Sequence, residues 1–202
     1  MKNFIEVFDN LLTTEECKFV VDYMNQKGVS APGKITVEEG LTVDKERKDS
    51  YDISLNFLNN LSCYPTFTSN EKNVKIKDII LPNLVKGLKR YVDIHSQIKY
   101  GIAPWTITSS YNLQKYNPGQ GYHAKHCENS DPSTSNRVLA WMFYLNTITD
   151  DGGTYFDNYD LTLNAKEGRL VLWPAYWTHL HKGIKSKTEI KYIATGWCEY
   201  VV

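Results

Sequence analysis

The feature that most limits the fold is the pattern of residue types from Trp105 onward. Short runs rich in Thr, Tyr, Val, Ile and Trp alternate there with glycine-containing turns such as 117–120 and 150–153. β-Branched and aromatic residues suit a pleated sheet, and glycine suits the turns between strands. The pattern predicts strands over residues 105–116, 121–128, 137–146, 153–156, 168–181 and 189–200, in the number and spacing of a sandwich or jelly-roll barrel.

The first half of the chain has helical periodicity instead. Thr13 and Glu16 form a capping-box pattern that predicts a helix over 14–27, and apolar residues spaced by three and four predict a second helical region over 73–96. Pro82 is expected to break that region or to start a turn of it. We therefore expect one domain over 1–202, mainly β, with helical support and first strands over about 1–100 and the barrel core over about 105–200.

Two polar segments are candidate lids over a site. Residues 28–50 contain several glycines and the charge-dense run 44–49, which favour a long exposed loop between short strands. The loop 129–134 is the second candidate.

Charge and hydropathy exclude several classes of protein. Basic and acidic side chains number 23 each, so we do not expect a nucleic-acid partner. The longest apolar runs, 138–145 and 170–177, are far shorter than the roughly 18 residues that cross a bilayer, so no membrane span is expected. Acidic residues near the start argue against a secretory signal. We expect a cytoplasmic protein, bacterial or phage-encoded, whose four scattered cysteines are free thiols.

Histidines gather in the β half and suggest a metal site. Residues i and i+2 of a strand project from the same face, so His126 and Glu128 can bind one ion together. His181, near the end of a later predicted strand, can supply the third ligand. Two histidines and one carboxylate with open positions favour non-haem Fe(II).

A lysine in the last predicted strand adds a second indication. If residues 173–197 form a hairpin with its turn near Ser186, His181 and Lys191 lie opposite each other on one face. The inward residues of the last strand would then be Lys191, Ile193, Thr195 and Trp197. A lysine that points into a barrel is costly unless an anion meets it, so Lys191 is a candidate partner for a carboxylate.

These residues together resemble a known family. The segments Tyr116–Tyr122, His126-Cys127-Glu128, Asn136–Val138, Phe143–Asn146 and Asp151–Gly153, followed by His181, Lys191 and Trp197, are similar in order and spacing to Fe(II)/2-oxoglutarate dioxygenases of the prolyl 4-hydroxylase type. The resemblance covers roughly 105–200. The opening residues 7–17 and, more loosely, Arg47–Ser50 resemble the start of such domains.

The resemblance implies a double-stranded β-helix, a jelly-roll core flanked by helices, in which His126, Glu128 and His181 hold Fe(II). It also implies that Lys191 binds the distal carboxylate of 2-oxoglutarate. Tyr116 and Tyr144 fall at positions near this cosubstrate and Trp197 at a pocket wall. Together with Thr195, which shares a strand face with Lys191 and Trp197, they are the further candidate cosubstrate-binding residues. The implied reaction consumes 2-oxoglutarate and O₂, with ascorbate as a further cofactor, and hydroxylates a C–H bond, first of a peptidyl proline or another peptide side chain.

One position departs from the family pattern. Members usually carry aspartate where this chain has Glu128, so an extra methylene must be absorbed by the strand or by the coordination mode. His123 and Cys127 are expected to face away from the metal. His179 shares a face with His181 and is either a group near the site or a hydrogen-bonded structural histidine.

Three alternatives keep the same ligands but change the function. The barrel could bind a metal or small molecule without turnover, although Lys191 argues against this. It could oxidise a modified nucleobase, which the charge balance does not favour. A zinc hydrolase fits less well, because no convincing general base accompanies the ligands.

Overall fold

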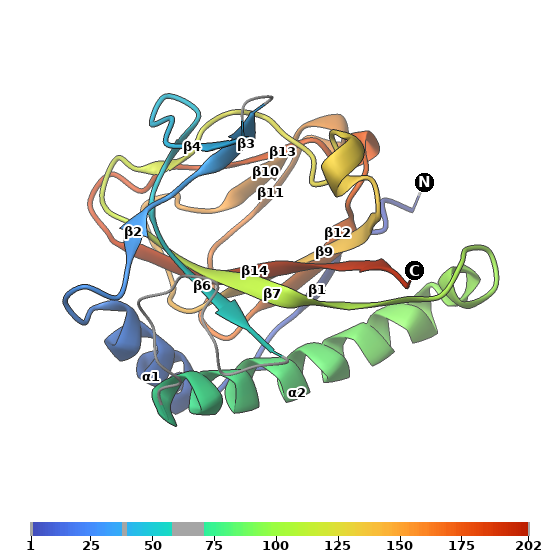
Figure 1. Ribbon diagram of the computed structural model, residues 1–202, viewed down its shortest axis with the longest axis horizontal. Helices are drawn as coiled ribbons and strands as arrows, with labels where there is room; N and C mark the ends of the chain where they lie inside the picture. The colour runs from blue at the N-terminus through green and yellow to red at the C-terminus, as the bar shows by residue number, and fades with distance from the viewer. Residues whose placement is uncertain (1, 38–39, 58–70, 202) are drawn as a thin grey trace.

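The computed structural model describes residues 2–37, 40–57 and 71–201, and its two main β-sheets are accompanied by two α-helices (Figure 1). Seven strands form the large sheet: β1 (Glu6–Phe8), β12 (Leu170–Pro174), β9 (Arg137–Tyr144), β14 (Lys191–Tyr200), β7 (Trp105–Tyr116), β6 (Tyr51–Asn56) and β2 (Ala31–Pro32), in that order. A three-stranded sheet has the order β11 (Leu161–Leu163), β10 (Thr154–Phe156), β13 (His181–Gly183). All these pairings are antiparallel. The predicted jelly-roll class, mainly β with N-terminal helices, is confirmed.

Smaller elements complete the chain. Two further pairs of short strands are β3 (Ile35–Val37) with β4 (Gly40–Thr42), and β5 (Lys48–Asp49) with β8 (Gly121–Tyr122). The 3₁₀ helices are η1 (Ser96–Lys99), η2 (Pro132–Thr134), η3 (Asp157–Tyr159) and η4 (Trp177–His179). The segment predicted as a loop between short strands therefore contains β2, β3, β4 and β5.

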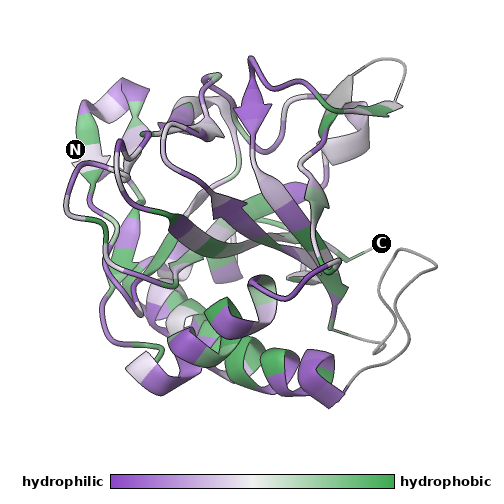
Figure 2. Cartoon of the chain, turned by 90° about the vertical axis from the view of Figure 1, so that its left-hand side faces the viewer, coloured by the Kyte–Doolittle hydropathy of each residue, from purple (hydrophilic) through white to green (hydrophobic). Residues whose placement is uncertain are grey.

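The helices cover one face of the large sheet. α1 (Thr14–Met24) begins at the predicted capping box, in which Thr13 and Glu16 satisfy each other's backbone N–H groups. α2 (Glu71–Ile94) buries Ile76, Ile80 and Leu84 completely. Hydrophobic and hydrophilic residues alternate along it (Figure 2), as expected for a helix that lies on a sheet. None of the helices in the described part of the chain is long and apolar enough to cross a membrane.

Pro82 does not interrupt the second helix, so that prediction is wrong. It lies inside α2, which continues through it to Ile94. The ring of a proline removes one backbone donor, but burial of the apolar stripe on both sides of Pro82 keeps the helix continuous. The first helix, predicted to reach residue 27, ends at Met24 instead. There the Asn25 side chain accepts hydrogen bonds from Lys115 Nζ and Tyr192 Oη of the large sheet.

Two hydrophobic cores lie on the two faces of the large sheet. One core fills the space between sheet and helices, and the other lies between the two sheets. Along β14, Tyr192, Ala194 and Cys198 face the helices, whereas Ile193 and Trp197 face the small sheet. This alternation confirms the predicted inward set and aims one face of β14 into the barrel.

Two predicted strands are broken. Only Gly121–Tyr122 of the predicted strand 121–128 is regular, and the predicted strand 168–181 divides into β12, η4 and β13. Pro174 ends β12, because the chain then turns from the large sheet to the small one. Conversely, β6 received no prediction, although the alternation of buried Ile53 and Leu55 with polar neighbours was a period-two signal.

The predicted hairpin over 173–197 does not exist. β13 pairs with β10, so that His181 lies opposite Phe156, while Lys191 of β14 lies opposite Tyr116 of β7. The two residues belong to different sheets, and their common orientation comes from the closure of the barrel. Cys17, Cys127 and Cys198 are free thiols as expected, and Cys63 lies outside the described residues.

Candidate functional site

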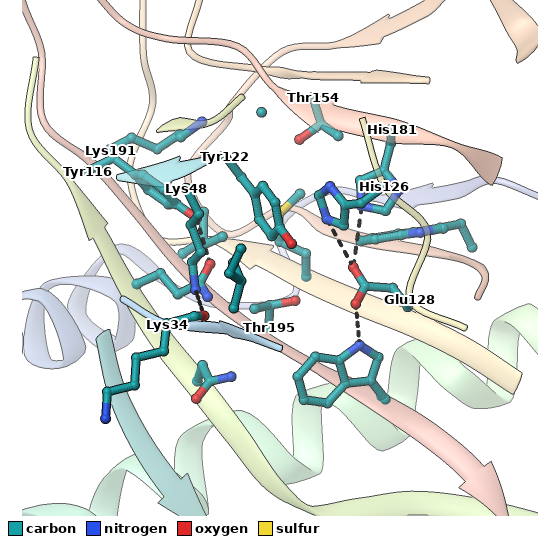
Figure 3. Close-up of a pocket in the computed structure, with 18 of the residues that line it drawn as sticks. Lys34, Lys48, Tyr116, Tyr122, His126, Glu128, Thr154, His181, Lys191 and Thr195 are labelled. Atoms are coloured by element: carbon teal, nitrogen blue, oxygen red, sulfur yellow. Dashed lines mark hydrogen bonds and ion pairs between the residues drawn. The ribbon is translucent and has the colours of Figure 1, made fainter. Parts of the chain in front are cut away.

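A cavity of about 260 Å³ opens between the two sheets and contains most of the predicted site residues (Figure 3). His126, Glu128 and His181 lie on one side of it, and Lys191 lies beside Tyr116 on the other. Ile193, Thr195 and Trp197 line the wall between them. The cavity therefore brings together residues from β7, β13, β14 and the segment that follows β8.

Of the three candidate metal ligands, only His181 belongs to a regular strand, because it begins β13, whereas His126 and Glu128 lie in the irregular segment after β8. His126 and His181 form an isolated antiparallel bridge, with reciprocal backbone N–H to O distances of 2.9 Å. Glu128 N donates to Ala175 O, which holds the rest of the triplet against the chain after β12. One potential ligand atom from each of the three side chains lies within 4.8 Å of the others. Glu128 Oε1 is 3.6 Å from His126 Nε2 and 3.4 Å from His181 Nε2.

The protonation of this group suits a divalent cation. His126 Nδ1 lies 2.9 Å from Ala124 O, and His181 Nδ1 lies 2.9 Å from His179 O. A carbonyl only accepts, so each Nδ1 donates a proton to it, and Nε2 is the ring nitrogen that faces Glu128. Burial, and then the nearby His181, lower the pKa of His126. Burial alone would raise the pKa of Glu128, but the facing imidazoles hold it well below its usual range.

These residues fit Fe(II) by the chemistry of their donors. Two neutral imidazoles and one carboxylate are the ligand set of non-haem Fe(II) oxygenases. They also leave one side of the group facing the cavity, where further ligands can enter.

Lys191 is a buried cation with no carboxylate beside it. Its Nζ donates to Ile184 O at 3.1 Å and lies 5.0 Å from the centre of the Tyr116 ring. Within the described ranges, no aspartate or glutamate oxygen lies within 4 Å of it. Burial lowers the pKa of Lys191 to about 8. A buried ammonium without a carboxylate partner is a binding site for an anionic group that enters the cavity.

A second buried lysine in the same cavity already has a partner. Lys48 of β5 lies 2.5 Å from Asp52 Oδ2, and Gln114 Nε2 donates to the same oxygen at 3.4 Å. Tyr116 Oη in turn donates to Gln114 Oε1 at 2.7 Å. The sequence analysis included Lys48 only in the candidate lid 28–50 and in the looser family match Arg47–Ser50. It assigned no role to Asp52 or Gln114, because their meeting with Lys48 depends on strand β6, which it did not predict.

The remaining site predictions divide into two groups. Tyr116, Thr195 and Trp197 line the cavity, although the Thr195 hydroxyl donates to Trp141 O. Tyr144 does not line it: its ring is fully buried behind the wall, and its hydroxyl shares a 2.7 Å hydrogen bond with Thr154, which does line it. β9 is buried on both of its faces, so its sequence shows no alternation of polar and apolar residues. The sequence therefore could not show whether Tyr144 projects into the cavity or away from it.

The other histidines stay outside the cavity. His179 Nε2 lies 2.7 Å from Asn3 O and its Nδ1 lies 2.9 Å from Thr178 Oγ1, which makes it a hydrogen-bonded structural histidine. His123 and Cys127 are not part of the cavity wall, as expected. Among the lid candidates, residues 28–50 contribute Lys34, Ile35, Leu41 and Lys48 to the wall, whereas the loop 129–134 contributes none.

Comparison with known proteins gives one match by family and many by fold. Residues 111–199 match the model of the 2OG-Fe(II) oxygenase superfamily. No curated protein matches the chain by sequence.

Several prolyl hydroxylase structures share the fold. A viral collagen prolyl hydroxylase from Paramecium bursaria Chlorella virus-1, in its 2OG complex, is 19% identical with a TM-score of 0.65, covering 98% of this chain and 97% of that one. A prolyl hydroxylase from Trichoplax adhaerens, in complex with a peptide fragment of hypoxia inducible factor, is 16% identical with a TM-score of 0.72, covering 98% and 84%. A Pseudomonas putida prolyl-4-hydroxylase is 15% identical with a TM-score of 0.63, covering 98% and 94%.

Proposed function

We propose that this chain is a 2OG-Fe(II) oxygenase, the superfamily whose model matches residues 111–199, and that it hydroxylates a C–H bond of a peptide side chain, with peptidyl proline as the first candidate. The observation that carries the proposal is the pairing, in one cavity, of the His126, Glu128 and His181 group with Lys191. Fe(II), 2-oxoglutarate and O₂ are the cofactors of this class. The peptide substrate is supported by the fold likeness to prolyl hydroxylases, one of which holds a peptide.

Each side chain has a distinct role in this proposal. His126, Glu128 and His181 would hold Fe(II), which when bound supplies the oxidation of 2-oxoglutarate by O₂ that is coupled to hydroxylation of the substrate. The backbone carbonyls of Ala124 and His179 accept hydrogen bonds from the Nδ1 atoms of His126 and His181, which leaves the two Nε2 atoms as the ligand atoms for the ion.

Lys191 would neutralise the far carboxylate of 2-oxoglutarate. Its Nζ is buried, and the Ile184 carbonyl occupies only one of its three donor hydrogens. Tyr116 forms the adjacent wall, and its hydroxyl is turned away toward Gln114. Lys48 is a weaker binding partner for the same carboxylate, because its charge is already compensated by Asp52.

The substrate would enter past the short strands β3 and β4. Leu41 of β4 lines the cavity and yet is 66% exposed, so an apolar side chain is available at the opening. Such a surface suits an apolar ring better than a charged group.

The experiment measures succinate and hydroxylated product together. The purified protein is incubated with Fe(II), ascorbate, O₂, 2-oxoglutarate and proline-containing peptides, and is compared with His126→Ala and Lys191→Ala. Lys182→Ala is the matched control, because Lys182 neighbours His181 but lies outside the cavity wall.

We expect both site variants to lose succinate formation and the control to retain it. Peptides should gain the mass of one oxygen atom, and matched peptides with alanine in place of proline should not. If no proline peptide is hydroxylated while another peptide side chain is, the first candidate substrate is wrong. If Lys191→Ala keeps the wild-type affinity for 2-oxoglutarate, the assignment of Lys191 is wrong.

A further inference from the structure

The two oxygens of the Glu128 carboxylate have different partners. Oε1 faces the imidazole Nε2 atoms of His126 and His181. Oε2 points the other way and accepts a 2.7 Å hydrogen bond from the indole Nε1 of Trp197, one of the dashed lines that meet at Glu128 in Figure 3. Only one oxygen is therefore left to face a metal.

The indole that holds Oε2 is itself fixed by an arginine. The Arg137 guanidinium lies 3.8 Å from the centre of the Trp197 ring, and its Nη1 donates to the backbone carbonyl of Glu128 at 3.0 Å. Arg137 and Trp197 come from the neighbouring strands β9 and β14. The three residues form a closed unit in which the large sheet supports both the backbone and the side chain of Glu128.

Glutamate needs such support more than aspartate does. Its side chain has one more rotatable bond, so more conformational freedom is lost when the carboxylate is held in one place. An indole N–H is a donor only, and it therefore fixes an ionised oxygen without competing for the metal. On the same backbone, an aspartate carboxylate would lie about 1.5 Å nearer the Cα atom, away from the positions at which the Glu128 oxygens meet the imidazoles and the indole.

We propose that Trp197 is a positioning residue that restricts Glu128 to one metal-binding oxygen, so that this chain requires glutamate where the resembled family carries aspartate. The inference rests on the proposed function, because it takes His126, Glu128 and His181 as the metal ligands. It goes further by assigning the coordination mode of Glu128 and the residue that determines it.

The test is a Co(II) titration of the full chain in its wild-type form and in three variants, Trp197→Phe, Glu128→Asp and the double variant. Both the affinity and the visible absorption bands of bound Co(II) are measured. Trp141→Phe is the matched control, because Trp141 is fully buried and its Nε1 has no hydrogen-bond partner among the residues that the structure describes. Thermal unfolding of each variant checks that the fold is retained.

We expect Trp197→Phe to weaken Co(II) binding by about 10- to 100-fold and to change the absorption bands, because loss of an outer partner of a ligand has effects of this size. Trp141→Phe should match the wild type. Glu128→Asp should also weaken binding, and adding Trp197→Phe to it should cause little further loss, because the shorter carboxylate no longer uses the indole.

Two results would overturn the inference alone, and a third would overturn the proposed metal site with it. If wild type binds Co(II) and Trp197→Phe binds it with the same affinity and spectrum, Trp197 does not position Glu128. The same conclusion follows if Trp197→Phe weakens Co(II) binding equally in the wild type and in Glu128→Asp. If wild type itself binds no Co(II), the metal site and this inference both fail.

Discussion

The ring of Tyr122 lies flat against the imidazole of His126, with ring centres 3.6 Å apart and an angle of 12° between the planes. On the other side of Tyr122, Lys48 Nζ lies 5.8 Å from the ring centre. Tyr122 therefore connects the candidate metal site to the paired lysine of β5.

Tyr122→Ala should weaken metal binding, because His126 would lose the ring that fixes its plane. Aromatic pairs contribute roughly 0.5–1.5 kcal/mol, so we expect about a two- to tenfold loss of Co(II) affinity. Tyr122→Phe keeps the stacked ring and should match the wild type. Equal losses in both variants would show that the hydroxyl, and not the ring, is responsible.

Affinity for 2-oxoglutarate should fall as the pH rises above about 8. Burial lowers the pKa of Lys191 to about 8, so the free site is cationic below that pH and loses its charge above it. Titration of the Mn(II)-loaded protein with 2-oxoglutarate between pH 7 and 9.5 measures the effect. Lys191→Arg should flatten the profile, because a guanidinium stays charged.

Lys191→Met should lose about 10- to 100-fold in 2-oxoglutarate affinity, because a hydrogen bond to a charged group contributes roughly 1.5–3 kcal/mol. The same titration at pH 7 measures it. If the affinity of the wild type for 2-oxoglutarate does not change through pH 8, the assignment of Lys191 as the partner of the far carboxylate is contradicted.

Asp9→Asn should destabilise the protein at neutral pH but not at low pH. Hydrogen bonds from Arg169 and Lys166 lower the pKa of Asp9 to about 2, against a usual value near 3.9. The stabilisation is therefore complete above about pH 4 and is lost as the pH falls toward 2. Since Asp9 is partly exposed, we expect about 1 kcal/mol or less.

Urea denaturation of wild type and Asp9→Asn at several pH values measures this difference. The gap in free energy of unfolding should narrow between pH 4 and pH 2. A gap that stays constant over that range would mean that the Asp9 charge does not stabilise the contact with Arg169.

Gly168→Ala should destabilise the protein more than Gly28→Ala. Both glycines have positive φ, +72° and +78°, so both substitutions place a Cβ in a strained backbone region. At Gly168 the Cβ would also lie 2.3 Å from Leu12 O, whereas at Gly28 no atom of the described residues outside its immediate chain neighbours lies within 4 Å of the added Cβ. We expect roughly 1–3 kcal/mol of additional loss.

Thermal denaturation of the two variants measures the comparison. It isolates the clash from the backbone strain, because the dihedral angles are similar. Equal melting temperatures would show that Leu12, whose N–H donates to Gly168 O, moves without cost.

Local pattern was enough to predict many elements. The strand 105–116 and the capping box at Thr13 have the predicted limits, and the inward set of β14 follows from strict alternation. The predicted pairing of Lys191 with His181 was wrong, because strand partners depend on which surfaces the whole chain buries. The role of Trp197 beside Glu128 had no signal in the spacing, since these residues are 69 positions apart.

The sequence by itself determined the residue types and, within each strand, the face on which they project. Neighbours along the chain control those properties, because they follow from the helical and strand periods. Only the tertiary structure decided which strands bring the predicted residues His126, Glu128, His181 and Lys191 to one cavity, and that an indole contacts the second oxygen of Glu128. These contacts require segments that are distant in the sequence to be held together. Burial of the two hydrophobic cores favours holding them together, and the entropy lost on closing the loops between them opposes it. The balance of the two determines which contacts form.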